Sequence, residues 1–322
     1  MHTYSGKSAA GLTCVFVLVL TGCSTGSEST AKSTSYAPYV SATEASAHDS
    51  AGSPVTYNLA FVISDGSDCT PKWNGTTALS DSAVKSRVSG LTQDGGTVRV
   101  SFGGASGKEL AASCDSASEL ARAYGKALDA AGSSQADFDI EGDELTDSDS
   151  VDLRSEAIAL LQKERGDVEV SFTLPVMPSG LDDGSVALLQ SANEHDVQVS
   201  TVNIMTMNYG ESYDGDMGGY AITSAKAAHS QLTDIFGTSD AATWKAMALT
   251  SMLGTNDVDN ETFTLDDATQ VRKFADEKGI GWVSMWATFR DQQCGEGSED
   301  DALTTCSGVD QEDGAFAEAF SG

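Results

Sequence analysis

The fold of this 322-residue chain is restricted most by a repeated alternation of strand-like and helix-like segments. Eight runs are rich in β-branched, aromatic and other apolar residues, a composition typical of strands. These runs are 36–40, 56–63, 97–102, 137–141, 168–174, 199–207, 244–252 and 280–287. Helical spacing is found in 82–91, 120–128, 151–163, 185–193, 221–236 and 264–279. Strands that alternate with helices in this way form a parallel sheet.

Eight such units predict an α/β protein that closes into a (β/α)8 TIM barrel with one catalytic domain, residues 36–322. The length fits, since such barrels commonly take about 250 residues. The alternative is an open, doubly wound sheet, but no Gly-x-Gly-x-x-Gly follows the first strand to bind a dinucleotide. We therefore expect no cofactor, and we expect the reactive residues at the carboxyl ends of the strands.

The amino terminus, residues 1–22, has the pattern of a secretory signal peptide. It contains one lysine, no acidic residue and an apolar run, Val15–Leu20, that is too short to span a bilayer. The run ends in Leu-Thr-Gly-Cys23, which resembles the lipobox of bacterial lipoproteins. The resemblance implies cleavage before Cys23 and lipidation of its thiol, with more than one acyl chain for stable anchoring. Residues 23–35, rich in Ser and Thr, are the expected flexible tether.

These features predict a lipoprotein on the extracellular face of the bacterial cell membrane, and ordinary secretion is the alternative. The formal net charge is −30 at pH 7, so a polyphosphate would be repelled and no nucleic-acid partner is expected. The charge says little about a neutral polysaccharide and indicates a highly hydrated surface, suited to salt or to solubility. We expect a monomer.

The chain has six cysteines, of which Cys14 belongs to the signal peptide and Cys23 to the lipid anchor. Four extracellular cysteines remain, enough for two disulfides. We expect these to join Cys69 with Cys114, and Cys294 with Cys306. No metal is expected, because neither pair has tight Cys-x-x-Cys spacing and none of the four histidines lies near them.

The most unusual of the predicted strands is 137–141, because its alternate residues are acidic. Side chains alternate between the two faces of a strand, so Asp137, Asp139 and Glu141 share one face and Phe138 and Ile140 the other. Same-face neighbours are roughly 6.7 Å apart along a strand, so three carboxylates in such a row repel one another.

Three interpretations of this row compete. A solvated acidic face is the simplest, since charge runs are usually solvated. A calcium loop is the second, because Asp-x-Asp-x-Glu-Gly begins like an EF-hand; it fails at the twelfth position, where Ser148 replaces the bidentate Glu. The third is a set of coupled carboxylates at the end of a buried strand, one of them tuned to act as an acid. We favour the third.

The segment Asp-Phe-Asp-Ile-Glu141-Gly resembles the active-site strand of the family 18 glycoside hydrolases, the chitinases and their relatives. The family pattern has a further Asp where this chain has Ser134. Ser-Phe-Gly103-Gly104 resembles the Ser-x-Gly-Gly motif of the family, whose small residues leave room beside the acidic strand. Taken alone, this motif is also what a tight turn would show.

Three further segments resemble family elements. Met205-Thr-Met207-Asn208 aligns with the sixth-strand motif, in which Met207 stands where many members have Tyr, and Asn208 where they have Asp; a prokaryotic branch also has Met at the Tyr position. Trp286, at the end of the eighth strand, matches the Trp beneath the sugar, and Trp73 is a candidate outer sugar-stacking residue. Arg290-Asp291 and the two last cysteines resemble the tail of that branch, so the resemblance spans 36–311.

The resemblance implies substrate-assisted retention, in which the 2-acetamido group of the substrate acts as nucleophile. Glu141 would be the general acid, Asp139 would orient the acetamide and stabilise the oxazolinium ion, and Asp137 would lie behind it. The chain is thus expected to be a surface chitinase that cleaves β-1,4-linked N-acetylglucosamine polymers. An endo-β-N-acetylglucosaminidase acting on N-glycans is one alternative. A non-catalytic lipoprotein that binds chito-oligosaccharides is the other.

Overall fold

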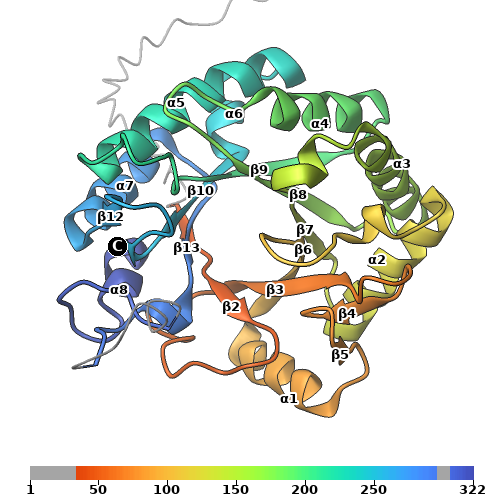
Figure 1. Ribbon diagram of the computed structural model, residues 1–322, viewed down its shortest axis with the longest axis horizontal. Coiled ribbons are helices and arrows are strands. Elements are labelled where there is room, and N and C mark those ends of the chain that lie inside the picture. The colour runs from red at the N-terminus through yellow and green to blue at the C-terminus, as the bar shows by residue number, and fades with distance from the viewer. Residues whose placement is uncertain (1–33, 296–304) are drawn as a thin grey trace, which may run out of the picture. The chain divides into compact units, whose positions relative to one another are not determined.

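The computed structural model describes residues 34–295 and 305–322. The predicted signal peptide, Cys23 and most of the predicted tether lie outside these residues. Within them the chain forms a closed parallel barrel, and Figure 1 shows the strands around a common centre with the helices outside. The predicted TIM-barrel fold is confirmed. Ser35, assigned to the tether by composition, belongs instead to the first strand, where it pairs with Trp282.

Eight strand positions close the barrel in the described part of the chain. In order they are β1 (Ser35–Tyr36) continued by β2 (Tyr39–Ser41), β3 (Thr56–Ser64), β6 (Thr97–Gly103), β7 (Gln135–Asp139), β8 (Glu169–Pro175), β9 (Val199–Met205), β10 (Met247–Met252) and β13 (Trp282–Trp286). The split first strand makes the closure: β1 pairs with β13, whereas β2 pairs with β3, both in parallel.

Helices connect most of these strands, as the spacing of apolar residues predicts. They are α1 (Ser82–Leu91), α2 (Ala117–Ala131), α3 (Ser148–Glu164), α4 (Asp183–Glu194), α5 (Met217–Phe236), α6 (Asp240–Lys245), α7 (Leu265–Lys278) and α8 (Ala315–Ser321). Thr264 and Asp267 form the capping box at the start of α7, and Gly279 ends the helix in the left-handed conformation. Residues 42–55 join β2 to β3 without a helix.

The loops contain several short strands and 3-10 turns. They are the strands β4 (Pro71–Trp73), β5 (Thr77–Ala78), β11 (Gly254–Thr255) and β12 (Thr262–Phe263), and the 3-10 turns η1 (Gln93–Gly95), η2 (Leu110–Ala112), η3 (Gly142–Leu145) and η4 (Thr288–Arg290). Both expected disulfides are present, Cys69–Cys114 and Cys294–Cys306. No helix in the described ranges has the length and apolar character needed to cross a membrane.

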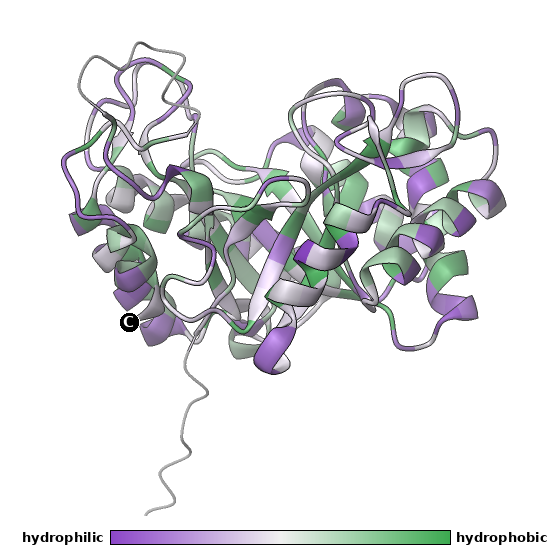
Figure 2. Ribbon diagram, turned by 90° about the horizontal axis from the view of Figure 1, so that it is seen from below, coloured by the Kyte–Doolittle hydropathy of each residue, from purple (hydrophilic) through white to green (hydrophobic). Residues whose placement is uncertain are grey.

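The hydrophobic core lies between the strands and the surrounding helices. Figure 2 shows hydrophobic residues on the central strands and hydrophilic ones mainly on the outer helices and loops. Phe102, Phe138 and Phe172 pack side by side on the outer face of three neighbouring strands, with ring centroids 5.3 and 5.7 Å apart. Their alternation places the polar residues of the same strands in the barrel interior.

Among the predicted strand boundaries, the start of the seventh strand is wrong by three residues and the end of the sixth by two. The seventh strand begins at Met247, and Trp244 belongs to α6, where the hydroxyl of Ser239 caps the first turn. Trp244 there stacks on His229 at 3.9 Å between ring centroids, so its burial comes from helix packing. The sixth strand ends at Met205, and Met207 lies in the loop that follows.

Candidate active site

A pocket of about 370 Å³ opens at the carboxyl ends of the barrel strands. Its wall includes the last residues of β7, β8, β9, β10 and β13. Six residues singled out from the sequence line it: Asp139, Glu141, Met205, Met207, Asn208 and Trp286. The barrel therefore brings together residues that are up to 147 positions apart in the chain, because parallel strands present their carboxyl ends at one rim.

The acidic row keeps its alternation past the end of the strand. Hydrogen-bonded pairing of β7 ends at Asp139, but the backbone N–H of Ile140 still donates to Thr173 O at 3.1 Å. Glu141 stays extended, with φ −145° and ψ 168°. Phe138 and Ile140 are fully buried in the core. Ser134 lies before β7, roughly 23 Å along the chain from Glu141, so the missing family Asp is remote from the pocket.

Asp137 lies deepest in the row and is 1% exposed. Four hydroxyl groups from three different strands, β2, β6 and β8, donate to its carboxylate. The donors are Tyr39 Oη at 3.0 Å, Ser101 Oγ at 2.7 Å, Ser171 Oγ at 2.7 Å and Thr173 Oγ1 at 2.8 Å. Hydrogen bonds of this number stabilise a buried carboxylate. Ser101 belongs to the Ser-x-Gly-Gly motif, but the other three hydroxyl residues were not identified from the sequence, because which strands are neighbours is not a local property.

A buried cation lies below this layer. Arg99, on β6, donates to Asn58 Oδ1 at 2.6 Å and lies 4.0 Å over the ring of Trp282. Burial lowers the pKa of Arg99, and the charge of Asp137 acts in the opposite direction. Arg99 thus places a positive charge at the bottom of the acidic row.

Asp139 has a different environment, although it is only 5% exposed. Its Oδ1 has no hydrogen-bond partner among the described residues, and the side chain lines the pocket. Burial raises the pKa of Asp139 well above its ordinary value, and the charges of Glu141 and Asp137 raise it further. An unpaired buried polar atom is costly, so this oxygen is available for a ligand group.

Glu141 is half-buried at the pocket wall. Its pKa is raised, first by burial and then by the charge of Asp257, which lines the same pocket. A glutamic acid that keeps its proton at higher pH than usual is suited to donate that proton. Asp257 was not singled out from the sequence, and no motif there marks it.

The two glycines of the Ser-x-Gly-Gly motif bring β6 against Asp139. Gly104 N–H donates to Asp139 O at 2.9 Å, and a Cβ on Gly103 would collide with that same oxygen. A Cβ on Gly104 would lie 2.8 Å from the ring of Phe61. Both glycines have positive φ, +95° and +92°, which other residues rarely adopt. The two glycines do not line the pocket themselves, but their lack of side chains leaves room for the neighbouring residues that line it, Phe61 and Asp139.

Aromatic rings form one wall of the pocket. Trp286 packs on Phe61, with ring centroids 5.4 Å apart, and meets the edge of Tyr39 at 5.7 Å. All three residues line the pocket. The expected role of Trp73 in outer sugar stacking is wrong: this residue is 1% exposed in the core, because β4 pairs with β3 and turns the ring inward.

The loop after β9 carries the two positions that differ from the common family pattern. Met207 and Asn208 both line the pocket, and Asn208 has φ +55°. Asn208 Oδ1 accepts a hydrogen bond from the backbone N–H of Asp257 at 3.1 Å. Glu261 Oε1 accepts from Gly210 N–H at 2.7 Å and fixes the far side of the loop. Asn208 thus holds the segment that carries Asp257.

Residues 34–295 and 305–322 contain no group of three or more His, Cys, Asp or Glu side chains placed to hold a metal ion.

A closed (β/α)8 barrel whose rim carries a row of carboxyl groups beside an aromatic wall defines the class of barrel glycosidases. No family model matches the chain. It is 35% identical over 275 residues to a probable bifunctional chitinase/lysozyme of Escherichia coli (strain K12), covering 80% of this chain and 31% of that protein. It is 34% identical over 275 residues to endochitinase 11 of Metarhizium anisopliae, covering 80% and 52%. The chain thus spans about a third and about half of the length of these two curated relatives.

Solved structures give a closer match in length. The catalytic domain of a hyperthermophilic chitinase from Pyrococcus furiosus is 31% identical, with a TM-score of 0.78, over 89% of this chain and 93% of that one. Active domain 2 of the chitinase from the same organism was solved as catalytic-site mutants complexed with chito-oligosaccharides; it is 30% identical, with a TM-score of 0.77 and the same coverage. The chain belongs to the chitinase-like family 18 of the glycoside hydrolases.

Proposed function

We propose that this protein hydrolyses β-1,4 linkages between N-acetylglucosamine units of chitin or chito-oligosaccharides by substrate-assisted retention. The observation that carries the proposal is the contrast between two neighbouring acids at one pocket. Asp139 is buried with an unpaired oxygen, and Glu141 is half-buried with a raised pKa. A sugar that brings its own nucleophile needs one group to position that nucleophile and one to protonate the leaving oxygen.

In the first step Glu141 gives its proton to the glycosidic oxygen while the bond from that oxygen to the anomeric carbon breaks. The acetamido oxygen of the same sugar attacks the anomeric carbon and forms an oxazolinium ion. Asp139 accepts a hydrogen bond from the acetamido N–H with its unpaired oxygen and faces the developing positive charge. Asp137, held by its hydroxyl donors, lies two residues before Asp139 on the same face of β7.

In the second step water attacks the anomeric carbon while the bond from that carbon to the acetamido oxygen breaks and restores the acetamide; Glu141, now a carboxylate, takes the proton of that water. Water attacks from the same face of the sugar ring from which the leaving group departed, so the configuration of the anomeric carbon is retained. Trp286 supports the apolar face of the reacting sugar. Met205, Met207 and Asn208 also line the pocket.

The relatives support the choice of substrate. One curated relative bears the name endochitinase, and the Pyrococcus furiosus structure was solved with chito-oligosaccharides. The other curated relative bears the name chitinase/lysozyme, so peptidoglycan belongs among the substrates to be tested.

The experiment is a turnover assay of the mature protein on chito-oligosaccharides, with product analysis, beside peptidoglycan and a high-mannose glycoprotein. The Glu141→Gln variant keeps the shape of the side chain and lacks its proton. We expect the wild type to release N-acetylglucosamine oligomers and the variant to lose about 10²–10⁴-fold in rate, the usual contribution of a general acid. Near-wild-type turnover by the variant would remove the assignment of Glu141. Tight binding of the oligomers by the wild type without cleavage would identify a binding protein instead.

We also propose that the protein is attached to the outer side of the bacterial membrane through a lipid on Cys23. The sequence pattern around Cys23 supports this, and the residue lies outside those that the structure describes. Mass spectrometry of the amino-terminal peptide from membranes is expected to show cleavage before Cys23 and an acylated thiol. A soluble mature protein with an unmodified Cys23 would identify secretion.

A further inference from the structure

A buried ion pair lies next to the turn that follows Glu141. Arg154, on α3, is fully buried and donates from Nε at 3.0 Å and from Nη2 at 2.9 Å to Glu109 Oε2. Glu109 precedes η2, in the loop after β6. The two side chains are each 1% exposed. The pair therefore joins the loop after one barrel strand to the helix after the next strand.

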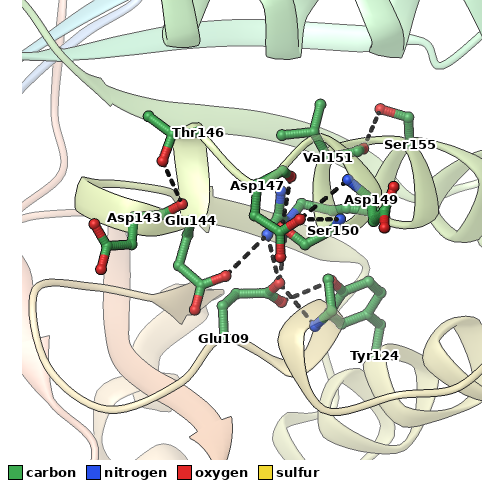
Figure 3. A network of polar contacts seen from close by, with 12 residues as sticks. Glu109, Tyr124, Asp143, Glu144, Thr146, Asp147, Asp149, Ser150, Val151 and Ser155 are labelled. Atoms are coloured by element: carbon green, nitrogen blue, oxygen red, sulfur yellow. Dashed lines mark hydrogen bonds and ion pairs between the residues drawn. The ribbon is translucent and has the colours of Figure 1, made fainter.

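Glu109 is held on its other sides as well, as Figure 3 shows. Tyr124 Oη donates to Oε1 at 2.7 Å, and the backbone N–H of Ala111 donates to Oε2 at 2.9 Å. The ring of Tyr124 meets the edge of Phe138 at 4.9 Å, and Phe138 lies between the two acidic residues of β7. Glu109 is thus fixed to the same strand that presents the acids.

Arg154 also reaches the turn that carries the chain away from Glu141. Its Nη2 lies 3.8 Å from Oε2 of Glu144, which belongs to η3. Burial and the charge of Glu109 raise the pKa of Glu144, while Arg154 and a hydrogen bond from the Glu109 backbone lower it. Glu144 therefore has both an anionic neighbour, Glu109, and a cationic one, Arg154.

The position of this cluster argues for a role beyond stability. A buried ion pair contributes little net stability compared with a well-packed apolar pair, because both charges must be desolvated. None of Glu109, Glu144 and Arg154 lines the pocket, so none contacts the sugar. What the cluster does hold is η3, whose first residue, Gly142, directly follows Glu141.

We infer that the Arg154–Glu144 contact positions Glu141 for proton transfer to the glycosidic oxygen. The inference rests on the proposed function, because it assigns Glu141 the role of acid. Glu144 and Arg154 are positioning residues, which act through the backbone of η3. Misplacement of a reacting group by about 1 Å costs up to about 100-fold in rate.

The test uses Glu144→Ala, because truncating Arg154 would leave Glu109 buried and unpaired. Asp143→Ala is the matched control: Asp143 is an exposed acid in the same turn, and Arg154 does not contact it. Each protein is assayed on a chito-oligosaccharide, whose leaving group needs a proton, and on its 4-nitrophenyl glycoside, whose leaving group hardly does. The value of kcat/KM is compared, since it reports the step in which the leaving group departs.

We expect Glu144→Ala to lower kcat/KM about 10-fold or more on the oligosaccharide and less than about 3-fold on the nitrophenyl glycoside. Asp143→Ala is expected to change neither by more than about 2-fold. Partial unfolding would lower kcat/KM equally on the two substrates. Equal losses on both substrates would therefore overturn the inference, and so would the absence of any loss on the oligosaccharide.

A second readout does not depend on turnover. Backbone hydrogen exchange over residues 142–146 is expected to be faster in Glu144→Ala than in wild type, and unchanged in Asp143→Ala. Unchanged exchange in Glu144→Ala would overturn the inference. Failure of the wild type to cleave either substrate would instead refute the proposed function, and the catalytic part of this inference with it.

Discussion

The substitution Asp139→Asn is expected to make the protein more stable at neutral pH and nearly inactive. Asp139 is 5% exposed, lies between two other acids of the same strand face, and has an oxygen without a partner among the described residues. Asparagine has almost the same shape and cannot ionise. It removes the charge that burial disfavours, and it removes the carboxyl group that the acetamide needs.

The magnitude follows from linkage between protonation and folding. The pKa of Asp139 is raised well above its ordinary value in the folded protein, chiefly by burial. Between the unfolded pKa, about 3.9, and the folded pKa, the folded state binds a proton that the unfolded state releases. Wild-type stability therefore falls as pH rises through this range. Each pKa unit of that rise corresponds to about 1.4 kcal/mol, so at pH values above the folded pKa the variant gains about this much for every unit.

Asp137→Asn is the matched control on the same strand and the same face. Four hydroxyl groups donate to the Asp137 carboxylate. An asparagine amide has no charge, and its N–H₂ group would place hydrogen-bond donors opposite some of these hydroxyl donors. Since a hydrogen bond to a charged group contributes about 1.5–3 kcal/mol, this variant is expected to be destabilised by about 2 kcal/mol or more.

The assay is the melting temperature of wild type and both variants between pH 4.5 and pH 7.5, with chito-oligosaccharide hydrolysis measured alongside. For a domain of this size about 1.4 kcal/mol corresponds to roughly 3 °C. The Asp139→Asn advantage is expected to grow to this size as pH rises, with activity lowered about 100-fold or more. A lower melting temperature than wild type at pH 7.5, or a difference that does not change with pH, would refute the reasoning.

Two further predictions concern the pocket wall and the acid. Trp286→Ala is expected to lower kcat/KM on chito-oligosaccharides about 10-fold, because the sugar loses an aromatic surface in the pocket. Trp73→Phe is the control and is expected to leave kcat/KM unchanged, since Trp73 lies in the core. Equal effects of the two substitutions would contradict the assignment of Trp286 to the sugar site. Asp257→Asn is expected to lower the pKa of Glu141 by removing a nearby negative charge, so the alkaline limb of the pH–rate profile moves to lower pH. A limb that stays in place or moves to higher pH would contradict this.

Much of the fold is predictable from the sequence because strand and helix periodicity are local. The row Asp137, Asp139 and Glu141 shares a face by strand parity alone, and the structure keeps that parity even beyond the paired residues. The capping box at Thr264 is likewise a pattern within four residues. Such features need no knowledge of which strands are neighbours.

Features that depend on distant parts of the chain were missed or misjudged. The hydroxyl donors to Asp137 come from β2, β6 and β8, and their convergence depends on barrel register. Trp73 is buried because a short hairpin folds back on β3. Trp244 reads as a strand residue by its apolar neighbours, but the cap at Ser239 places it in a helix. In each case a contact between distant parts of the chain determines the position of the side chain, which composition and local pattern do not determine.

The central claim, that the substrate supplies the nucleophile while Glu141 supplies the proton, is tested most directly by the anomeric form of the first product. Proton nuclear magnetic resonance within the first minutes of chito-oligosaccharide hydrolysis separates the two anomers before mutarotation mixes them. The account predicts that the new reducing end appears first as the β-anomer. Initial release of the α-anomer would mean direct attack by water and would contradict it.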